Sequence, residues 1–205
     1  QAVRESVVVL KNENIFPLSK DLETLVVAGK GADNLGMQCG GWSIDWQGGQ
    51  GDITIGTTIL DGIKKTVSES TEIIYSEDGS DIVSNSENIA VVVIGEDPYT
   101  EWFGDKENLD LSDDDINLIS DLKDKGFKVA ILLISGRPLN VANHIDQWDA
   151  FAAIWLPGTE GDGVSDVLFG DFGSTGRLSF PWPINTEEGS NADKDNLLFE
   201  IGYGL

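Results

Sequence analysis

The chain has 205 residues, enough for one domain with a full hydrophobic core, and its 36 acidic and 13 basic residues give a formal charge of −23. That charge repels nucleic acids and anionic membranes, so we expect no partner of either kind and favour neutral or cationic ligands. A single cysteine, Cys39, excludes an internal disulfide and a cysteine-based metal site, and we expect neither a metal nor a cofactor.

The predicted elements alternate between strands and helices along the chain. Residues 1–5 resemble the end of a helix. Short apolar runs rich in β-branched residues then predict buried parallel strands. These strands are Leu25–Ala28, Glu72–Tyr75, Ile89–Ile94, Val129–Ile134 and Phe151–Leu156. Helical spacing of apolar residues, with capping and stop signals, predicts the helices between them. These helices are Thr57–Val67, Ser112–Lys125, Pro138–Ile145 and Gly161–Phe169.

This alternation with short connections indicates an α/β fold, a doubly wound, mostly parallel sheet with helices on both faces. Arg177–Phe180 is a candidate late edge strand, and the polar segment Asn185–Leu198 is predicted to be a loop. No run of about 20 apolar residues could span a bilayer, and the first residues lack a signal-peptide hydrophobic region. Because the chain starts and stops abruptly, we interpret it as a fragment. The scattered acidic residues predict a heavily solvated surface, which fits a salty or extracellular setting.

The first predicted strand leads into a glycine-rich loop that contains Trp42 and Trp46. A dinucleotide site requires Gly-x-Gly-x-x-Gly opening directly into a helix, and here the third glycine is one position late. The loop therefore fails the dinucleotide pattern. Tryptophan on such a loop is a common surface for the apolar face of a sugar ring. The alternative is that both indoles plug the edge of the sheet.

The third predicted strand ends in acidic and aromatic residues, Gly95-Glu96-Asp97-Pro98-Tyr99-Thr100-Glu101-Trp102-Phe103-Gly104-Asp105. Strand carboxyl ends are where open α/β sheets bind ligands, and a carboxylic acid kept protonated among aromatic rings can donate its proton to a leaving group. We expect Glu96 to be a structural acceptor of backbone amides and Asp105 to hold the loop's return. Glu101 lies further out and is the candidate acid–base residue.

The remaining residues are weaker candidates for a functional role. His144 is the only histidine and receives no role, whereas Arg137, after another strand, is a candidate partner for a carboxylate on a neighbouring loop. Neither a Gly-x-Ser-x-Gly elbow nor a Walker-type lysine is present, which excludes the usual serine hydrolase and nucleotide hydrolase sites.

Taken together, the motifs resemble the C-terminal α/β sandwich domain of glycoside hydrolase family 3, in particular its exo-acting β-glucosidases and β-glucan glucohydrolases. The matching segments occur in the family's order along nearly the whole chain, residues 1–205. They include Ala32-Asp33-Asn34-Leu35-Gly36, Gln38-Cys39-Gly40-Gly41-Trp42, Trp46-Gln47-Gly48, Gly95-Glu96-x-Pro98-Tyr99-x-Glu101, Ser135-Gly136-Arg137-Pro138 and Gly202-Tyr203-Gly204-Leu205.

The resemblance implies a function shared between two domains. An N-terminal TIM-barrel domain, absent from this chain, would supply an aspartate nucleophile, and Glu101 would be the catalytic acid/base. Trp46, with Trp42 second, would stack on the sugar of the leaving group. Retention through a covalent glycosyl-enzyme requires the two carboxyl groups about 5–5.5 Å apart. The substrate would be a β-glucoside or β-glucan, the enzyme secreted or periplasmic, and the chain inactive without its barrel.

Two departures and two alternatives accompany this interpretation. Gly31 stands where relatives often carry histidine, and Trp102-Phe103 replaces smaller, more polar residues, which would reshape the leaving-group subsite. One alternative function is a stand-alone carbohydrate-binding or regulatory module, which binding of sugars by the chain alone would distinguish. A flavodoxin-like nucleotide binder is disfavoured by the glycine pattern and by the negative charge.

Overall fold

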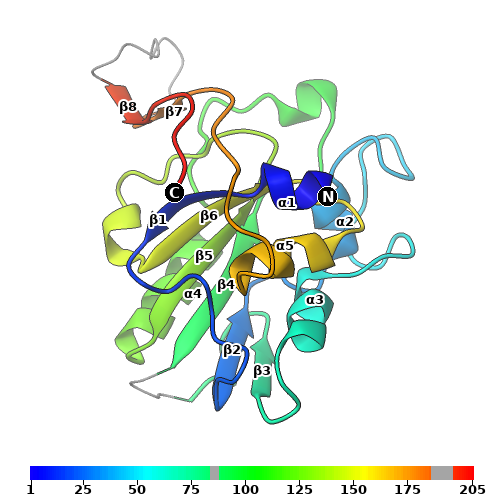
Figure 1. Ribbon diagram of the computed structural model, residues 1–205. Helices are drawn as coiled ribbons and strands as arrows, with labels where there is room; N and C mark the ends of the chain where they lie inside the picture. Colours follow the sequence, from blue (N-terminus) through cyan, green and yellow to red (C-terminus); the bar gives the residue numbers. More distant parts are fainter. Residues whose placement is uncertain (84–87, 186–195) are drawn as a thin grey trace.

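The computed structural model describes residues 1–83, 88–185 and 196–205, and its centre is a six-stranded sheet with the order β1-β6-β5-β4-β2-β3 (Figure 1). The strands are β1 (Val8–Asn12), β2 (Thr24–Ala28), β3 (Glu72–Ser76), β4 (Ile89–Gly95), β5 (Lys128–Ile134) and β6 (Ala150–Trp155). β1 runs antiparallel to β6, and the other neighbouring strands are parallel. The predicted mostly parallel sheet is confirmed.

Helices cover both faces of this sheet, as predicted (Figure 1). One face carries α1 (Ala2–Ser6), α2 (Leu35–Cys39), α3 (Ile59–Thr66) and α5 (Gly161–Leu168), and the other carries α4 (Asp113–Asp124). Two short 3-10 helices, η1 (Glu101–Gly104) and η2 (Ile145–Gln147), lie in loops. A small antiparallel pair, β7 (Trp182–Pro183) and β8 (Leu197–Phe199), lies outside the main sheet.

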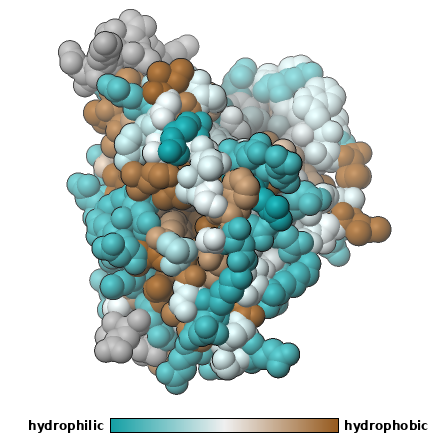
Figure 2. Space-filling view, in the orientation of Figure 1, coloured by the Kyte–Doolittle hydropathy of each residue, from teal (hydrophilic) through white to brown (hydrophobic). Residues whose placement is uncertain are grey.

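The strands read as continuous apolar runs because both faces of the sheet are buried. Along β4, Ala90, Val92 and Ile94 belong to the core under α4, whereas Val91 and Val93 belong to the core under α3 and α5. Successive side chains of a strand point to opposite faces, so one strand must supply both cores. The face of the molecule shown in Figure 2, in contrast, mixes hydrophilic residues with several hydrophobic patches.

Side-chain caps define where two of the helices begin. The Ser112 hydroxyl accepts a hydrogen bond from the Asp115 N–H at 3.2 Å, and the Thr58 hydroxyl accepts one from the Asp61 N–H at 3.1 Å. Each bond satisfies an amide that has no partner inside its helix. The Ser112 cap confirms the predicted start of α4.

Three predictions about local structure were wrong or incomplete. Residues 138–144 form no helix but a β-bridge at Asn140 and a turn over 142–144, because the Asn140 N–H donates to the Leu109 carbonyl at 2.9 Å and pairs this segment with the loop after η1. Arg177–Phe180 is not a strand, since β1 already occupies the edge beside β6. That edge strand follows α1 directly and was not predicted. In the predicted loop Asn185–Leu198, residues 186–195 lie outside the described residues, and β8 begins at Leu197.

The carboxyl ends of the parallel strands bring several loops to one edge of the sheet. The connection after β2 leads to helices on one face, whereas the connection after β4 leads to α4 on the other. The chain therefore changes direction between β2 and β4, which is where open α/β sheets form ligand crevices. Within the described ranges, the structure has no helix long and apolar enough to cross a membrane.

Candidate active site

Two segments build the site, the β4 loop (residues 96–105) and the tryptophan loop (residues 40–51). The β4 loop leaves the sheet beside β5, where the Glu96 N–H donates to the Ile134 carbonyl at 3.0 Å. Gly95 has φ +154°, and a Cβ there would lie 1.9 Å from the same carbonyl oxygen. Only glycine allows the chain to turn out of β4 so close to β5.

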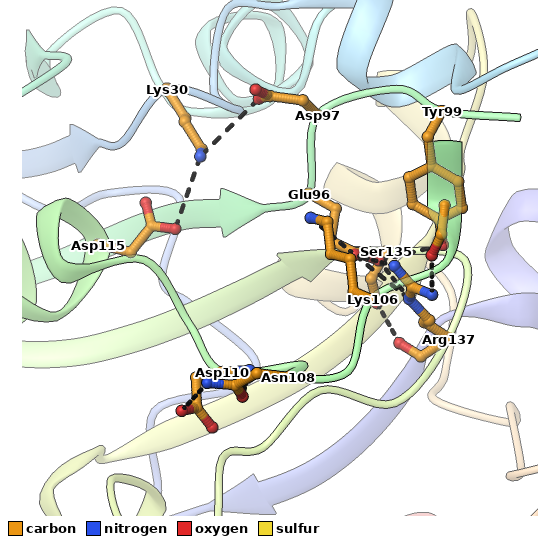
Figure 3. Close-up of polar contacts among 11 residues, drawn as sticks. Lys30, Glu96, Asp97, Tyr99, Lys106, Asn108, Asp110, Asp115, Ser135 and Arg137 are labelled. Atoms are coloured by element: carbon orange, nitrogen blue, oxygen red, sulfur yellow. Dashed lines mark hydrogen bonds and ion pairs between the residues drawn. The ribbon is translucent and has the colours of Figure 1, made fainter. Parts of the chain in front are cut away.

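Arg137 holds both ends of the β4 loop, and Figure 3 shows its contacts with Glu96 at the first end. Its Nη2 donates to Glu96 Oε1 at 2.7 Å, and its Nη1 donates to the Gly104 carbonyl at 2.6 Å. Its guanidinium also lies 4.6 Å from the centroid of the Tyr99 ring. The predicted pairing of Arg137 with a carboxylate of a neighbouring loop is confirmed.

Glu96 is committed to this network and is not available to a ligand. Its side chain is only 7% exposed, accepts from Arg137 and from the Tyr99 hydroxyl, and lies 3.7 Å from Lys106 Nζ. The structural role predicted for Glu96 is therefore right, but its partners are side chains rather than backbone amides. Burial, followed by the charge of Glu96, raises the pKa of Tyr99 to about 12.

A second ion pair network holds the loop from the other side (Figure 3). Lys30, just after β2, lies 3.9 Å from Asp97 and 3.8 Å from Asp115 at the start of α4. Burial raises the pKa of Asp115, and the nearby Lys30 charge opposes that effect. Sequence reasoning missed Lys30, because a lysine within a glycine-rich loop carries no pattern that predicts its partner.

Glu101 lies outside both networks, at the start of η1, and its side chain is exposed. Its φ of +49° places it in the left-handed region, which is uncommon for a residue other than glycine and costs free energy. The turn is closed by the Phe103 N–H donating to the Thr100 carbonyl at 3.2 Å and by the Asp105 N–H donating to the Trp102 carbonyl at 3.1 Å. As predicted, Asp105 thus helps to close the end of the loop through a backbone hydrogen bond.

The tryptophan loop is closed at its base and at its tip. Asn34 Oδ1 accepts from the Met37 N–H at 3.0 Å and from the Gly51 N–H at 2.8 Å, so one side chain caps α2 and ties the end of the loop to its start. At the tip, the Trp42 N–H donates to the Trp46 carbonyl at 3.0 Å. This bond keeps the two indoles on the same short turn.

The two loops touch through glycines and one glutamine. A Cβ on Gly41 would lie 2.1 Å from the Tyr99 carbonyl oxygen, and one on Gly48 would lie 2.7 Å from the Pro98 Cβ. Gln47 Oε1 accepts a hydrogen bond from the Thr100 N–H at 3.2 Å. The glycines therefore permit the close approach of the tryptophan loop to the β4 loop, a role that the failed dinucleotide pattern did not reveal.

Four aromatic side chains meet where the two loops touch, and we call Trp42, Trp46, Trp102 and Phe103 the aromatic cluster. The Trp46 ring is central, with its centroid 6.4 Å from Trp42, 5.6 Å from Trp102 and 6.1 Å from Phe103. Trp42 is 68% exposed and Trp46 40% exposed, so neither is buried against the edge of the sheet. Trp102 follows Glu101 directly in the sequence, so the backbone of Glu101 adjoins this cluster.

Replacing Gly41 by alanine tests the contact between the loops. The added methyl group would meet the Tyr99 carbonyl and the Thr100 side chain, so we expect a loss of about 1–3 kcal/mol in the free energy of unfolding. Urea unfolding measures it. The matched control is Gly173→Ala, because a Cβ at Gly173 would meet no atom within 4 Å. Equal stability of the two variants would show that the loops do not touch as described.

Among the described residues, no group of three or more histidine, cysteine, aspartate or glutamate side chains could hold a metal ion. The exposed groups on the two loops are instead aromatic rings and carboxyl groups, among them Asp45 and Glu101. A carboxyl group can donate or accept a proton, and aromatic rings can stack on the apolar face of a neutral ligand.

The family model of the glycosyl hydrolase family 3 C-terminal domain matches residues 7–205. The chain belongs to this family. The solved structure of a Pseudoalteromonas exo-1,3/1,4-beta-glucanase, in its Q683A mutant, is 40% identical to this chain and has a TM-score of 0.88. The match covers 100% of this chain and 35% of that chain. A beta-glucosidase from Listeria innocua, 23% identical with a TM-score of 0.78, shares the fold; it is matched over 100% of this chain and 32% of its own.

Curated relatives of the chain are glycosidases. A lysosomal beta glucosidase from Dictyostelium discoideum is 30% identical over 98% of this chain and 28% of its own length. A periplasmic beta-glucosidase from Salmonella typhimurium is 27% identical over 100% of this chain and 34% of its own length. The chain therefore spans about a third of these relatives.

Proposed function

We propose that this domain supplies the general acid/base, Glu101, of a retaining exo-acting β-glucosidase or β-glucan glucohydrolase. The enzyme would release terminal β-D-glucosyl residues from the non-reducing end. The family membership supports this proposal, and so do the names of the relatives, which include beta-glucosidases and an exo-1,3/1,4-beta-glucanase. The periplasmic and lysosomal relatives support a location outside the cytosol.

The observation that carries the proposal is the position of Glu101 beside the aromatic cluster. Glu96 is only 7% exposed and Asp97 lies 3.9 Å from Lys30, whereas Glu101 is exposed and lies outside both ion pair networks. A proton donor must reach the glycosidic oxygen, and only an outward-facing carboxyl group can do so. Asp97 and Asp105 are exposed as well, so the choice of Glu101 also rests on the family pattern, in which the residue at its position is the acid/base.

The chemistry requires a second carboxylate that this chain would receive from another domain. An aspartate of an N-terminal TIM barrel would attack the anomeric carbon while Glu101 gives its proton to the departing oxygen. Glu101 would then accept a proton from water as that water breaks the glycosyl-enzyme bond. Since the chain spans about a third of its relatives, we propose that it is inactive without the barrel.

Trp46 and Trp42 would hold the departing sugar. Trp46 lies within the aromatic cluster and is partly exposed, so a sugar ring stacked on it would keep its glycosidic oxygen near Glu101. Trp42 would border the same sugar from the outer side. Positioning of this kind converts binding free energy into a correctly oriented proton transfer.

The anomeric form of the first product tests the proposed reaction. With the complete enzyme and a β-linked glucose disaccharide, we expect proton NMR to show β-glucose first and α-glucose later, by spontaneous mutarotation. Retention gives this order because two successive inversions occur at the same carbon. α-Glucose as the first product would contradict the mechanism, and absence of hydrolysis would contradict the function.

A further inference from the structure

We propose that Trp102 and Phe103 form a binding surface for a second sugar ring of the leaving group, one unit further from the cleaved bond than the ring on Trp46. This inference rests on the proposed function and gives it a substrate class. The enzyme would act preferentially on β-glucan oligosaccharides of three or more units rather than on disaccharides.

The exposure of these two rings is the first observation. Trp102 is 62% exposed and Phe103 is 58% exposed, although large aromatic side chains are usually much more buried. They are adjacent in the sequence, their centroids lie 5.8 Å apart, and their planes differ by 32°. The two rings thus form one contiguous apolar surface, and contiguous exposed apolar surfaces often mark binding sites.

The arrangement of the rings around Trp46 is the second observation. Trp46 meets Trp102 at 70° and Phe103 at 85°, both edge-to-face contacts. In such contacts two ring faces do not cover each other, so each ring retains area for a ligand. The centroid distance of 5.6 Å between Trp46 and Trp102 is comparable to the length of one pyranose unit. Because the two ring planes differ by 70°, successive sugars resting on these rings would follow a bent glucan chain rather than a straight one.

Charge identifies the kind of ligand. The chain carries a net charge of −23, and the β4 loop itself contributes Glu96, Asp97, Glu101 and Asp105. An anionic polysaccharide or a nucleotide would be repelled by this surface. A neutral glucan has apolar ring faces for the aromatic side chains and hydroxyl groups that remain in water. Neutral β-glucan is the occupant that these properties favour.

The test is kcat/KM of the complete enzyme with Trp102→Ala for three substrates: a β-glucan trisaccharide, the matching disaccharide and an aryl β-glucoside. We expect about a tenfold loss for the trisaccharide and little change for the other two, because only the trisaccharide has a second leaving-group sugar. Trp102→Leu, which keeps apolar bulk but lacks a flat ring, should show the same selectivity. Ile55→Ala is the matched control, since Ile55 is 96% exposed.

Each other result has a distinct meaning. An equal loss for all three substrates in both Trp102 variants would overturn the inference, because it would indicate that Trp102 supports the loop or contacts another domain. Unchanged kinetics for the trisaccharide would also overturn it. In both cases β-glucosidase activity of the parent enzyme would leave the proposed function intact. A parent enzyme without activity on any of the three would overturn both.

Discussion

Replacing Glu101 by glutamine in the complete enzyme is expected to lower kcat/KM for β-linked disaccharides by about 10²–10⁴-fold. The amide has nearly the same shape as the carboxyl group, but it cannot protonate a departing sugar oxygen. An aryl glucoside with an acidic phenol as its leaving group needs no such proton. Formation of the glycosyl-enzyme from that substrate should therefore be nearly normal, and the selective loss can be measured by comparing the two substrates.

The control for this variant is Glu107→Gln, which removes another exposed carboxyl group just beyond the β4 loop. We expect Glu107→Gln to leave both substrates unaffected. Equal losses on the disaccharide and on the aryl glucoside in Glu101→Gln would indicate a binding or structural role. Unchanged activity on both would remove Glu101 from the mechanism.

Replacing Arg137 by methionine has the largest expected effect on stability. Methionine fills a similar volume but removes the guanidinium from the Gly104 carbonyl and from the Glu96 carboxylate. That carboxylate is 7% exposed and keeps Lys106 and the Tyr99 hydroxyl as partners. Removing one partner of a buried ion pair costs about 3–5 kcal/mol. Because the Arg137 side chain is 23% exposed, we expect a loss of about 3 kcal/mol in the free energy of unfolding. Urea unfolding measures it.

Two further variants identify the cause of that loss. Arg137→Lys keeps the charge but cannot reach Glu96 and Gly104 together, so it should recover only part of the stability. The double variant Arg137→Met/Glu96→Gln should lose less stability than the sum of the two single variants, because the second change removes the buried charge that has lost Arg137. Strict additivity would show that the contact between Arg137 and Glu96 is not what holds the loop.

The same network should affect catalysis through Glu101. Arg137 binds residues at both ends of the β4 loop, and Glu101 lies between them in a strained conformation. Strain of this kind persists only where the surrounding structure imposes it. We therefore regard Arg137 as a positioning residue and expect Arg137→Lys to lower activity more for disaccharides than for activated aryl glucosides.

The fold was largely predictable because strand patterning is a direct consequence of burial. Ile89–Ile94 and Val129–Ile134 are apolar throughout, as strands covered on both faces must be, and β4 and β5 match them closely. The failed helix at 138–145 had a suitable proline at its start, but its backbone pairs with a loop some 30 positions earlier. Local propensity cannot anticipate such a distant partner. The position of β1 depends in the same way on β6.

The site was predictable in composition but not in contacts. Glu101, Trp42 and Trp46 stood out because they lie on predicted connecting loops, which carry a disproportionate share of binding and catalytic residues. Their assignment as catalytic and sugar-binding residues remains a prediction. The loops come together because Gly41 and Gly48 have no side chain at their points of contact. The Gln47 side chain adds one hydrogen bond, which it accepts from the Thr100 N–H. Such features become visible only in three dimensions.

The product formed from azide tests the central claim about Glu101 most directly. In Glu101→Gln with an activated aryl glucoside, azide needs no general base and should attack the glycosyl-enzyme from the face that water normally uses. We predict a rise in turnover with azide concentration and β-glucosyl azide as the product, identified by NMR. α-Glucosyl azide would instead make Glu101 the nucleophile, and absence of any rescue would contradict its role as the acid/base.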